Sequence, residues 1–220
     1  PCVNKSELET TLYGSDVYLG FMHLKSLNEE SARLIQFERE KNGSYLSLED
    51  FINRIPIGIE TLQILIFIGA FRFTGKTKNQ LLVIARLILV NFKPENRGLL
   101  LIQEPVKEFV LPELARSAFE DAFDEIELLS FPVSCSPFDL LKTKFRGDVM
   151  AKDLLKHHKK SVRMLAYLIS RKHVPTKMGA MFFGTWIDAQ GELFDTAHFT
   201  GSLKEYPFQG GGCYLLRGNV

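Results

Sequence analysis

One short segment, Arg171–Asp188, combines the two residue types that hold a nucleic-acid strand. Its cations are Arg171, Lys172 and Lys177, and its aromatic rings are Phe182, Phe183 and Trp186. Lysine and arginine neutralise phosphates, and ring faces stack on bases of any sequence. The segment therefore predicts a surface for single-stranded nucleic acid. A second interpretation stays open for each single ring, namely alternation between the core and the rim of a β-barrel.

Other polar groups are wrongly arranged for catalysis or for metal binding. Adjacent carboxylates occur at Glu49–Asp50, Glu120–Asp121 and Asp124–Glu125. We expect each pair at a helix start or on a polar helix face, whereas two-metal phosphoryl transfer needs carboxylates that converge from a sheet. His157 and His158 with Cys135 are too sparse for a metal site, and Asp188 is interpreted as a turn former. We therefore expect no catalytic residue and no metal ligand in this chain.

The tripeptide Gly75-Lys76-Thr77 has the look of a phosphate-binding loop. That motif needs another glycine five residues before Gly75, and this position holds Ala70. We interpret the tripeptide as a glycine turn followed by the start of a helix.

Composition indicates an ordinary globular protein. The chain has 220 residues, of which 45% are hydrophobic and 24% charged, enough for one large or two small domains. Its net charge of +1 averages an acidic stretch at residues 113–127 and a basic stretch at residues 152–177. The basic stretch gives the C-terminal part a local positive field.

Cysteine usage and hydropathy predict a cytoplasmic protein without membrane attachment. Cys2, Cys135 and Cys213 form neither a disulfide framework nor a zinc pattern, and no signal peptide is visible. The apolar run Ile55–Phe73 is interrupted by proline, glycine and charged residues, which is typical of a buried helix. Because the chain starts at Pro1 and ends within a strand-like stretch, we interpret it as an excised piece of a longer protein.

Periodicity predicts helices first and strands later. We expect helices at residues 29–41, 48–55, 59–68 and 77–92, with Asn28 and Ser47 as N-caps. Prolines then punctuate a connector that has one amphipathic helix near residues 114–129. We expect strands at residues 161–170, 180–188, 192–199 and 213–217. Several short antiparallel strands of this kind match a small OB-fold barrel.

Four blocks of sequence support a comparison with a known family. The first part is similar to the tandem helix–hairpin–helix region of the bacterial DNA polymerase III alpha subunit in VNKSE, YLGFMHLKSLNEESARLI and SLEDFINRI followed by LQILIFIGAF. The second part resembles the linker and OB domain of the same family in SFPVSCSPFDLL and RKHVPTKMGAMFFGTWIDAQGELFDTAHF, ending GGCYLLRGNV. The blocks follow the family order and cover nearly the whole chain.

The resemblance implies an α+β architecture in three parts. An all-α tandem helix–hairpin–helix domain would occupy residues 1–92, a connector with a helical segment residues 93–150, and a truncated OB-fold β-barrel residues 151–220. Lys25, Ser26 and Asn28 of the first hairpin would bind duplex DNA through backbone N–H groups at a helix N-terminus. The second hairpin, Pro56–Gly58, suits anions less because proline has no N–H. The barrel would hold single-stranded template with Arg171, Lys172, Lys177, Phe182, Trp186 and Arg217.

The resemblance also implies the role of the parent protein and its partners. The parent would be a DNA-directed DNA polymerase, a nucleotidyltransferase with Mg²⁺ in its palm domain, and this segment would bind DNA during replication without a cofactor of its own. A sliding clamp and other replisome subunits are possible partners. The nearest candidate for a clamp-binding peptide is Leu99, Leu100 and Leu101 within Gly98–Ile102.

Two alternatives remain at this point. The chain could be a protein-interaction scaffold that docks other replisome subunits. It could also be a stand-alone OB-fold protein that binds single-stranded DNA and carries an unrelated helical half.

Overall fold

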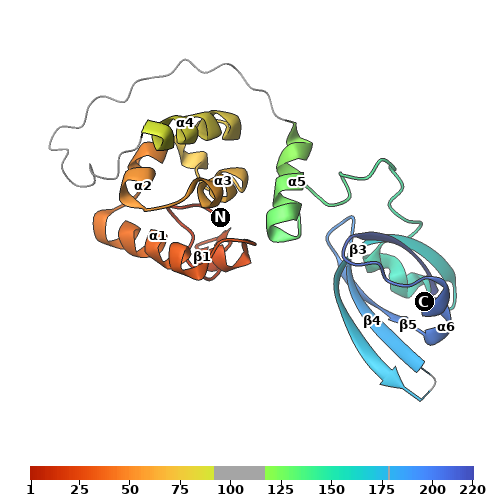
Figure 1. Ribbon diagram of the computed structural model, residues 1–220. Coiled ribbons are helices and arrows are strands. Elements are labelled where there is room, and N and C mark those ends of the chain that lie inside the picture. The colour runs from red at the N-terminus through yellow and green to blue at the C-terminus, as the bar shows by residue number, and fades with distance from the viewer. Residues whose placement is uncertain (92–116, 178) are drawn as a thin grey trace. The chain divides into compact units, whose positions relative to one another are not determined.

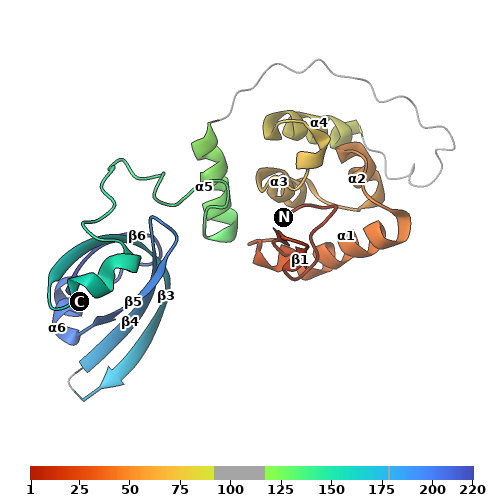
Figure 2. The same cartoon turned by 180° about the vertical axis from the view of Figure 1, so that it is seen from behind.

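The computed structural model describes residues 1–91, 117–177 and 179–220. These residues form two compact units, Pro1–Ser134 and Cys135–Val220, shown in Figures 1 and 2. The first is mainly helical and the second is built on an antiparallel sheet. The predicted α+β class, with helices first and a curled antiparallel sheet second, is confirmed.

The described part of the first unit has five α-helices and a small hairpin. The helices are α1 (Glu29–Asn42), α2 (Leu48–Arg54), α3 (Ile59–Phe67), α4 (Lys78–Asn91) and α5 (Ala118–Leu129). Short 3₁₀ helices η1 (Phe21–His23) and η2 (Arg72–Thr74) precede α1 and α4, and strands β1 (Thr11–Tyr13) and β2 (Asp16–Tyr18) pair near the N-terminus.

Side-chain caps fix where these helices begin. The Asn28 side chain accepts a hydrogen bond from the Ser31 N–H at 2.7 Å, and the Ser47 hydroxyl accepts one from the Asp50 N–H at 3.1 Å. Such bonds satisfy N–H groups that have no partner inside the helix. The two predicted N-caps are therefore confirmed.

The core of the first unit lies between α1, α2, α3 and α4. Tyr45, Phe51 and Phe71 are fully buried in it. Their rings meet edge to face, with centroids 4.9 and 5.0 Å apart along the series, the arrangement that the ring quadrupoles favour. Phe51 of α2 thereby contacts Tyr45, which precedes α2, and Phe71, which follows α3.

Helix α5 belongs to the first unit, although the sequence predicts it within a connector. Leu129 lies in the core of that unit, and the Leu128 carbonyl accepts a hydrogen bond from the Lys25 N–H at 2.9 Å. Lys78 of α4 forms ion pairs with Asp121 and Asp124 at 2.6 and 3.2 Å. Residues from Cys135 onward join the second unit instead.

The second unit is a four-stranded antiparallel sheet with the strand order β5-β4-β3-β6. Its strands are β3 (Ser161–Thr176), β4 (Gly179–Asp188), β5 (Leu193–His198) and β6 (Cys213–Asn219). A 3₁₀ helix η4 (Ala151–His157) precedes β3, and a short helix α6 (Thr200–Glu205) lies between β5 and β6. Figure 2 shows the strands curling rather than forming a flat layer.

Strand β3 is longer than the sequence predicts. It continues past Ser170 to Thr176 and includes Pro175. Beyond Tyr167 it pairs with β4 alone, because its pairing with β6 ends there. Proline is tolerated at such an edge, where one side of the strand needs no donor.

Candidate nucleic-acid interface

The first hairpin, Lys25–Asn28, lies between η1 and α1, and its Lys25, Ser26 and Asn28 are exposed. Ser26 has a φ of 66°, a left-handed conformation that costs energy in a residue other than glycine. The three predicted contact residues do lie together at one helix N-terminus. Their contact with DNA stays a prediction.

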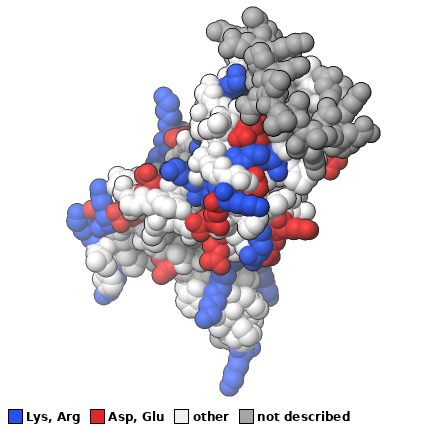
Figure 3. Space-filling view, turned by 90° about the vertical axis from the view of Figure 1, so that its left-hand side faces the viewer, with Lys and Arg blue, Asp and Glu red and all other residues white. Residues whose placement is uncertain are grey.

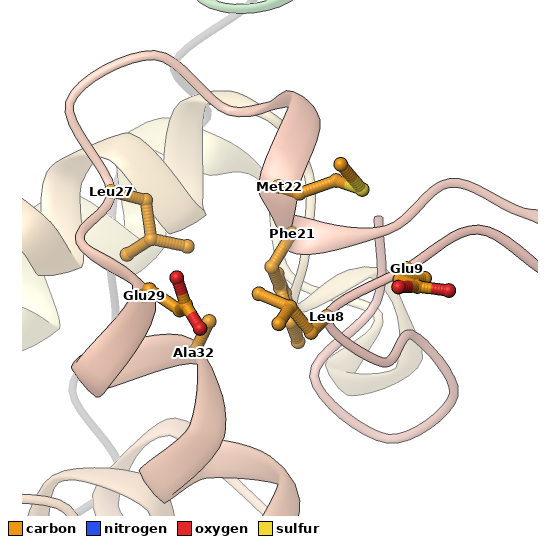
Figure 4. A pocket seen from close by; sticks show the side chains of 7 residues that line it. All are labelled: Leu8, Glu9, Phe21, Met22, Leu27, Glu29 and Ala32. Atoms are coloured by element: carbon orange, nitrogen blue, oxygen red, sulfur yellow. The ribbon is translucent and has the colours of Figure 1, made fainter.

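Two carboxylates directly follow this hairpin. Glu29 and Glu30 occupy the first turn of α1, where the helix dipole stabilises negative charge. A neighbouring hollow of about 230 Å³ is lined by Leu8, Glu9, Phe21, Met22, Leu27, Glu29 and Ala32. Figure 4 shows the side chains of Glu9 and Glu29 on opposite sides of Phe21 and Leu8. Glu29 is paired with Arg33 at 2.6 Å, so the hollow beside the first hairpin combines apolar side chains with a carboxylate whose charge is partly balanced.

The turn between α3 and α4 carries basic side chains, and the sequence analysis did not predict a binding site there. A hollow of about 310 Å³ there is lined by Gly69, Arg72, Lys76, Thr77, Lys78, Leu81 and Asp121. Arg72 and Lys76 are exposed, whereas Lys78 is half-buried with its two carboxylate partners. Arg72 also lies 3.8 Å from the buried Glu125 carboxylate, which balances part of its charge. This turn therefore places two exposed cations, one of them paired, at a helix N-terminus, a position that favours anions.

The Gly75-Lys76-Thr77 tripeptide is part of this turn. Gly75 has a φ of 69° and ends η2. The Thr77 hydroxyl then caps α4 by accepting from the Gln80 N–H at 3.2 Å, and the Gln80 side chain accepts from the Thr77 N–H at 3.0 Å. The prediction of a glycine turn and a helix start is confirmed. The sequence carries a signal for this turn that could have been used. Gly69 and Gly75 lie between two apolar helices, with Arg72 between the two glycines and Lys76 directly after the second.

In the second unit, neighbouring cations point to different faces of the sheet. Arg171 lies opposite Gly184 and Lys172 lies opposite Phe183 in the β3–β4 register. Since successive side chains alternate between faces, Arg171 and Lys172 cannot bind one strand from the same side. The Arg171 guanidinium lies 5.9 Å from the centre of the Phe208 ring, so Arg171 shares the face that carries the aromatic cluster.

An aromatic cluster covers that face of the sheet. It consists of Phe182, Trp186, His198, Phe208 and Tyr214, with neighbouring ring centroids 4.9 to 6.0 Å apart. Trp186 is fully buried and donates its indole N–H to the Thr196 hydroxyl at 2.7 Å. The prediction that Trp186 stacks on a base is therefore corrected, because its ring belongs to the core of the second unit.

Phe182 has two neighbours on this face that the sequence analysis did not predict. Phe182 is half-buried, with its ring centroid 4.9 Å from that of His173 and 5.8 Å from that of Phe208. His173 is exposed and lies opposite Phe182 in the register. Phe208 comes from the stretch between α6 and β6, for which the sequence analysis made no prediction. Arg171, His173, Phe182 and Phe208 thus combine charge and ring faces on one side of the sheet.

The two remaining predicted cations lie elsewhere. Lys177 is exposed at the tip of the β3–β4 hairpin. Arg217 is exposed on β6, opposite Arg163, which is itself bound to Asp148 at 2.8 Å. The structure therefore spreads the predicted cations over the hairpin tip, both faces of β3 and strand β6.

The prediction that Asp188 forms a turn is confirmed, since it lies at the start of the turn between β4 and β5. Its two carboxylate oxygens accept N–H groups of Ala151, Gln190 and Glu192 at 2.8 to 3.0 Å. Burial opposes ionisation of Asp188, but the backbone donors outweigh it and hold the pKa of the carboxyl below its ordinary value.

The surface charge is mixed. On the face shown in Figure 3, basic and acidic side chains are interspersed.

Within residues 1–91, 117–177 and 179–220, no group of three or more His, Cys, Asp or Glu side chains could hold a metal ion. None of the helices described there has the length and apolarity to cross a bilayer. The predicted clamp-binding residues Leu99, Leu100 and Leu101 lie outside the described part of the chain.

Comparisons with known proteins agree with the helical geometry. The family described as "Helix-hairpin-helix motif" matches residues 1–81. The chain is 30% identical over its whole length to the DNA polymerase III subunit alpha of Borreliella burgdorferi, 29% over 93% of its length to that of Aquifex aeolicus, and 26% over 94% to that of Staphylococcus aureus. It covers only 20%, 17% and 20% of these relatives, about a fifth of their length. The predicted resemblance to this subunit is confirmed.

Proposed function

We propose that this chain, a relative of the DNA polymerase III alpha subunits along its entire length, is a DNA-binding and non-catalytic portion of such a polymerase. The observation that carries the proposal is the helix–hairpin–helix match over residues 1–81 within a chain of that ancestry. The alternative of a stand-alone OB-fold protein with an unrelated helical half loses its basis, because the similarity includes both halves.

The helical unit would hold duplex DNA mainly at the α3–α4 turn. Helix–hairpin–helix motifs bind phosphates through N–H groups at a helix N-terminus and do not read sequence. At the α3–α4 turn, the exposed Arg72 and Lys76 line the hollow, and Arg72 also lies 3.8 Å from the Glu125 carboxylate. At the first hairpin, Glu30 in the first turn of α1 would repel the same phosphates, while Glu29 is paired with Arg33 at 2.6 Å. Lys25, Ser26 and Asn28 would therefore make peripheral contacts.

The second unit would be an OB barrel that holds single-stranded template. Support comes from its antiparallel strands in the order β5-β4-β3-β6, their curl, and the helix between β5 and β6. Such a barrel binds nucleic acid on one face of its sheet. Arg171, His173, Phe182 and Phe208 would form that surface, with Lys177 as a phosphate contact at the hairpin tip.

For the parent protein we propose a replicative, Mg²⁺-dependent DNA-directed DNA polymerase of the cytoplasm. The metal would act in its palm domain, and this portion would contribute template guidance without a cofactor. A sliding clamp and other replisome subunits are proposed partners of the parent.

Fluorescence anisotropy with two labelled probes, a DNA duplex and oligo-dT, tests both binding surfaces. We expect Arg72→Ala/Lys76→Ala to weaken duplex binding about tenfold at low salt. The logarithm of the binding constant should also fall less steeply with the logarithm of the salt concentration, by the amount expected for the loss of about one to two phosphate contacts. Binding of oligo-dT should be unchanged. The matched control, Lys5→Ala/Lys41→Ala, removes two exposed lysines of the same unit and should bind duplex normally.

The second unit is tested in the same assay. Arg171→Ala/Phe182→Ala should weaken oligo-dT binding about tenfold, since a stacked base and a phosphate contact are lost, while Lys142→Ala/Lys144→Ala should not. If the unaltered chain binds neither probe at low salt, the proposed function is wrong. If the unaltered chain binds DNA and the substituted chains bind it with the same affinity, the proposed function stands and the assigned surfaces are wrong.

A further inference from the structure

Arg72 lies between the hollow at the α3–α4 turn and a buried carboxylate. Its side chain is 67% exposed and lines the hollow together with Lys76 and Thr77. Its Nη2 atom also lies 3.8 Å from the Oε1 atom of Glu125 on α5, and Glu125 is 2% exposed. At 3.8 Å the two charges attract each other without forming a hydrogen bond. The guanidinium is therefore only loosely paired within the protein and is largely open to solvent.

The lack of a side chain at Gly69 decides where this guanidinium lies. Gly69 has a φ of 74°, and a β-carbon at this position would come within 2.7 Å of the Arg72 Nε atom and 3.1 Å of its Nη2 atom. The guanidinium therefore lies directly against the Gly69 backbone, beside the hollow that both residues line. The nitrogen that faces Glu125 is thus also next to the space that an anion would enter.

The second oxygen of Glu125 has different partners. Its Oε2 atom accepts the N–H groups of Val133 and Ser134 at 2.7 Å each, a short distance that is typical of hydrogen bonds to a charged acceptor. Ser134 is the last residue of the first unit, so this carboxylate fixes the end of the unit to α5. Glu125 thus has a cation beside one oxygen and two backbone donors on the other.

We propose that Arg72 exchanges Glu125 for a DNA phosphate when the first unit binds duplex, so that Glu125 restrains duplex binding and senses it. The inference rests on the duplex-binding function proposed above and adds its regulation. A phosphate that enters the hollow competes with Glu125 for one guanidinium. It can approach to hydrogen-bonding distance and bind two N–H groups at once, which the carboxylate at 3.8 Å does not.

The exchange couples the hollow to the end of the first unit. Once Arg72 has turned to the phosphate, the charge of Glu125 rests on the N–H groups of Val133 and Ser134, and these bonds strengthen. The coupling is reciprocal, because two binding equilibria that share one group must affect each other equally. Glu125 therefore lowers the duplex affinity by the same factor by which bound duplex weakens its attraction for Arg72.

Glu125→Gln tests the competition and preserves the backbone contacts. Both N–H groups bind one oxygen of Glu125, which the glutamine oxygen replaces, while an uncharged NH2 group takes the place of the oxygen beside Arg72. We expect the duplex affinity, measured by fluorescence anisotropy at low salt, to rise about two- to fivefold, the range for an ion pair with one exposed partner. In an Arg72→Ala background the same substitution should have no effect, since the restrained cation is absent.

Glu127→Gln is the matched control. It removes the same charge from an exposed position of the same helix, two residues from Glu125 and therefore on another side of α5. Its effect on duplex affinity should be much smaller, because solvent and salt screen charges that are far apart. The Pro1 amino group, which lies near both Arg72 and Glu125, is retained in every variant.

A second measurement needs no change at Glu125. Hydrogen exchange of the Val133 and Ser134 amides should slow when duplex saturates the unaltered chain. It should stay the same when duplex saturates Arg72→Ala, because Glu125 has no such cation to lose there.

The outcomes separate this inference from the proposed function. The inference is overturned if the unaltered chain and Glu125→Gln bind duplex equally, or if the gain persists in the Arg72→Ala background. Exchange of the two amides that does not respond to duplex would overturn it as well. In each of these cases the chain still binds duplex and the proposed function stands. An unaltered chain that binds no duplex would remove the proposed function, and this inference with it.

Discussion

At the scale of single residues, Asp188 shows how a buried charge can stabilise a fold. It is 2% exposed, yet its carboxylate is ionised because three backbone N–H groups point at its oxygens. One donor, Ala151, precedes β3 and two follow β4. The carboxylate therefore connects the η4 segment to the β4–β5 turn, and the sheet depends on its charge state.

Replacing Asp188 tests this connection. Asp188→Asn puts an amide where two acceptor oxygens are needed, so at least one buried N–H loses its partner. We expect the free energy of unfolding of the second unit to fall by about 1–3 kcal/mol at neutral pH. Urea unfolding followed by the fluorescence of Trp186, the one tryptophan of the chain, measures the change.

The pH dependence of that difference has a definite sign. The folded-state pKa of Asp188 lies below the ordinary value of 3.8. Its stabilising contribution is therefore fully present above that value and is lost as the pH falls through the folded-state pKa. The gap between the unaltered chain and Asp188→Asn should stay constant from neutral pH down to about 4 and shrink below it. The exposed Asp195→Asn should show almost no gap, and a gap that widens in acid would contradict this account.

Residue identity predicts chemistry better than it predicts exposure. The sequence correctly marked the β3–β4 segment as basic and aromatic, but not which ring faces solvent. Trp186 is buried because Phe208, more than twenty positions along the chain, returns to lie against it with ring centroids 5.8 Å apart. No local spacing encodes a contact that a distant, irregular segment provides.

At the scale of elements, apolar periodicity together with end signals decided what could be predicted. Helices α1 and α2 have side-chain caps and start at the predicted residues, and α3 starts as predicted after Gly58 without such a cap. Helix α6 has no side-chain cap bond, and the strands of the β1–β2 hairpin are three residues each. Both escaped prediction, because neither carries a cap or a long enough apolar alternation.

The attachment of α5 is a second element-scale property open to test. Lys78 is 13% exposed and lies between Asp121 and Asp124. Lys78→Met keeps the apolar stem but leaves the two carboxylates without this cation. We expect a loss of about 1–3 kcal/mol, below that of a fully buried pair because Asp121 is partly solvated. Hydrogen exchange of peptides from α5 should accelerate, while exchange in α2 should not.

A matched surface pair provides the control for Lys78. Lys156 contacts Asp153 at 2.7 Å, but its side chain is 77% exposed. Solvent and salt screen such pairs, so Lys156→Met should leave the free energy of unfolding almost unchanged. Equal effects of the two substitutions would show that burial does not set the strength of the α5 attachment.

At the scale of the whole molecule, the two units have separate and unequal cores. The first unit has one continuous cluster that includes residues of α1, α2, α3, α4 and α5. The second unit has two small clusters, one around Met164 and one around Trp186. Because stability grows with the apolar surface buried, the second unit should be the weaker one.

Separate cores predict that the chain unfolds in two steps. Trp186 fluorescence reports the second unit, whereas far-ultraviolet circular dichroism is dominated by the helices of the first. We expect the fluorescence transition at a lower urea concentration than the dichroism transition, since coincident probes are the mark of a single cooperative unit. Asp188→Asn should move the fluorescence midpoint alone, and Lys78→Met the dichroism midpoint alone. A single transition shared by both probes, shifted equally by either substitution, would mean that the two cores are energetically coupled.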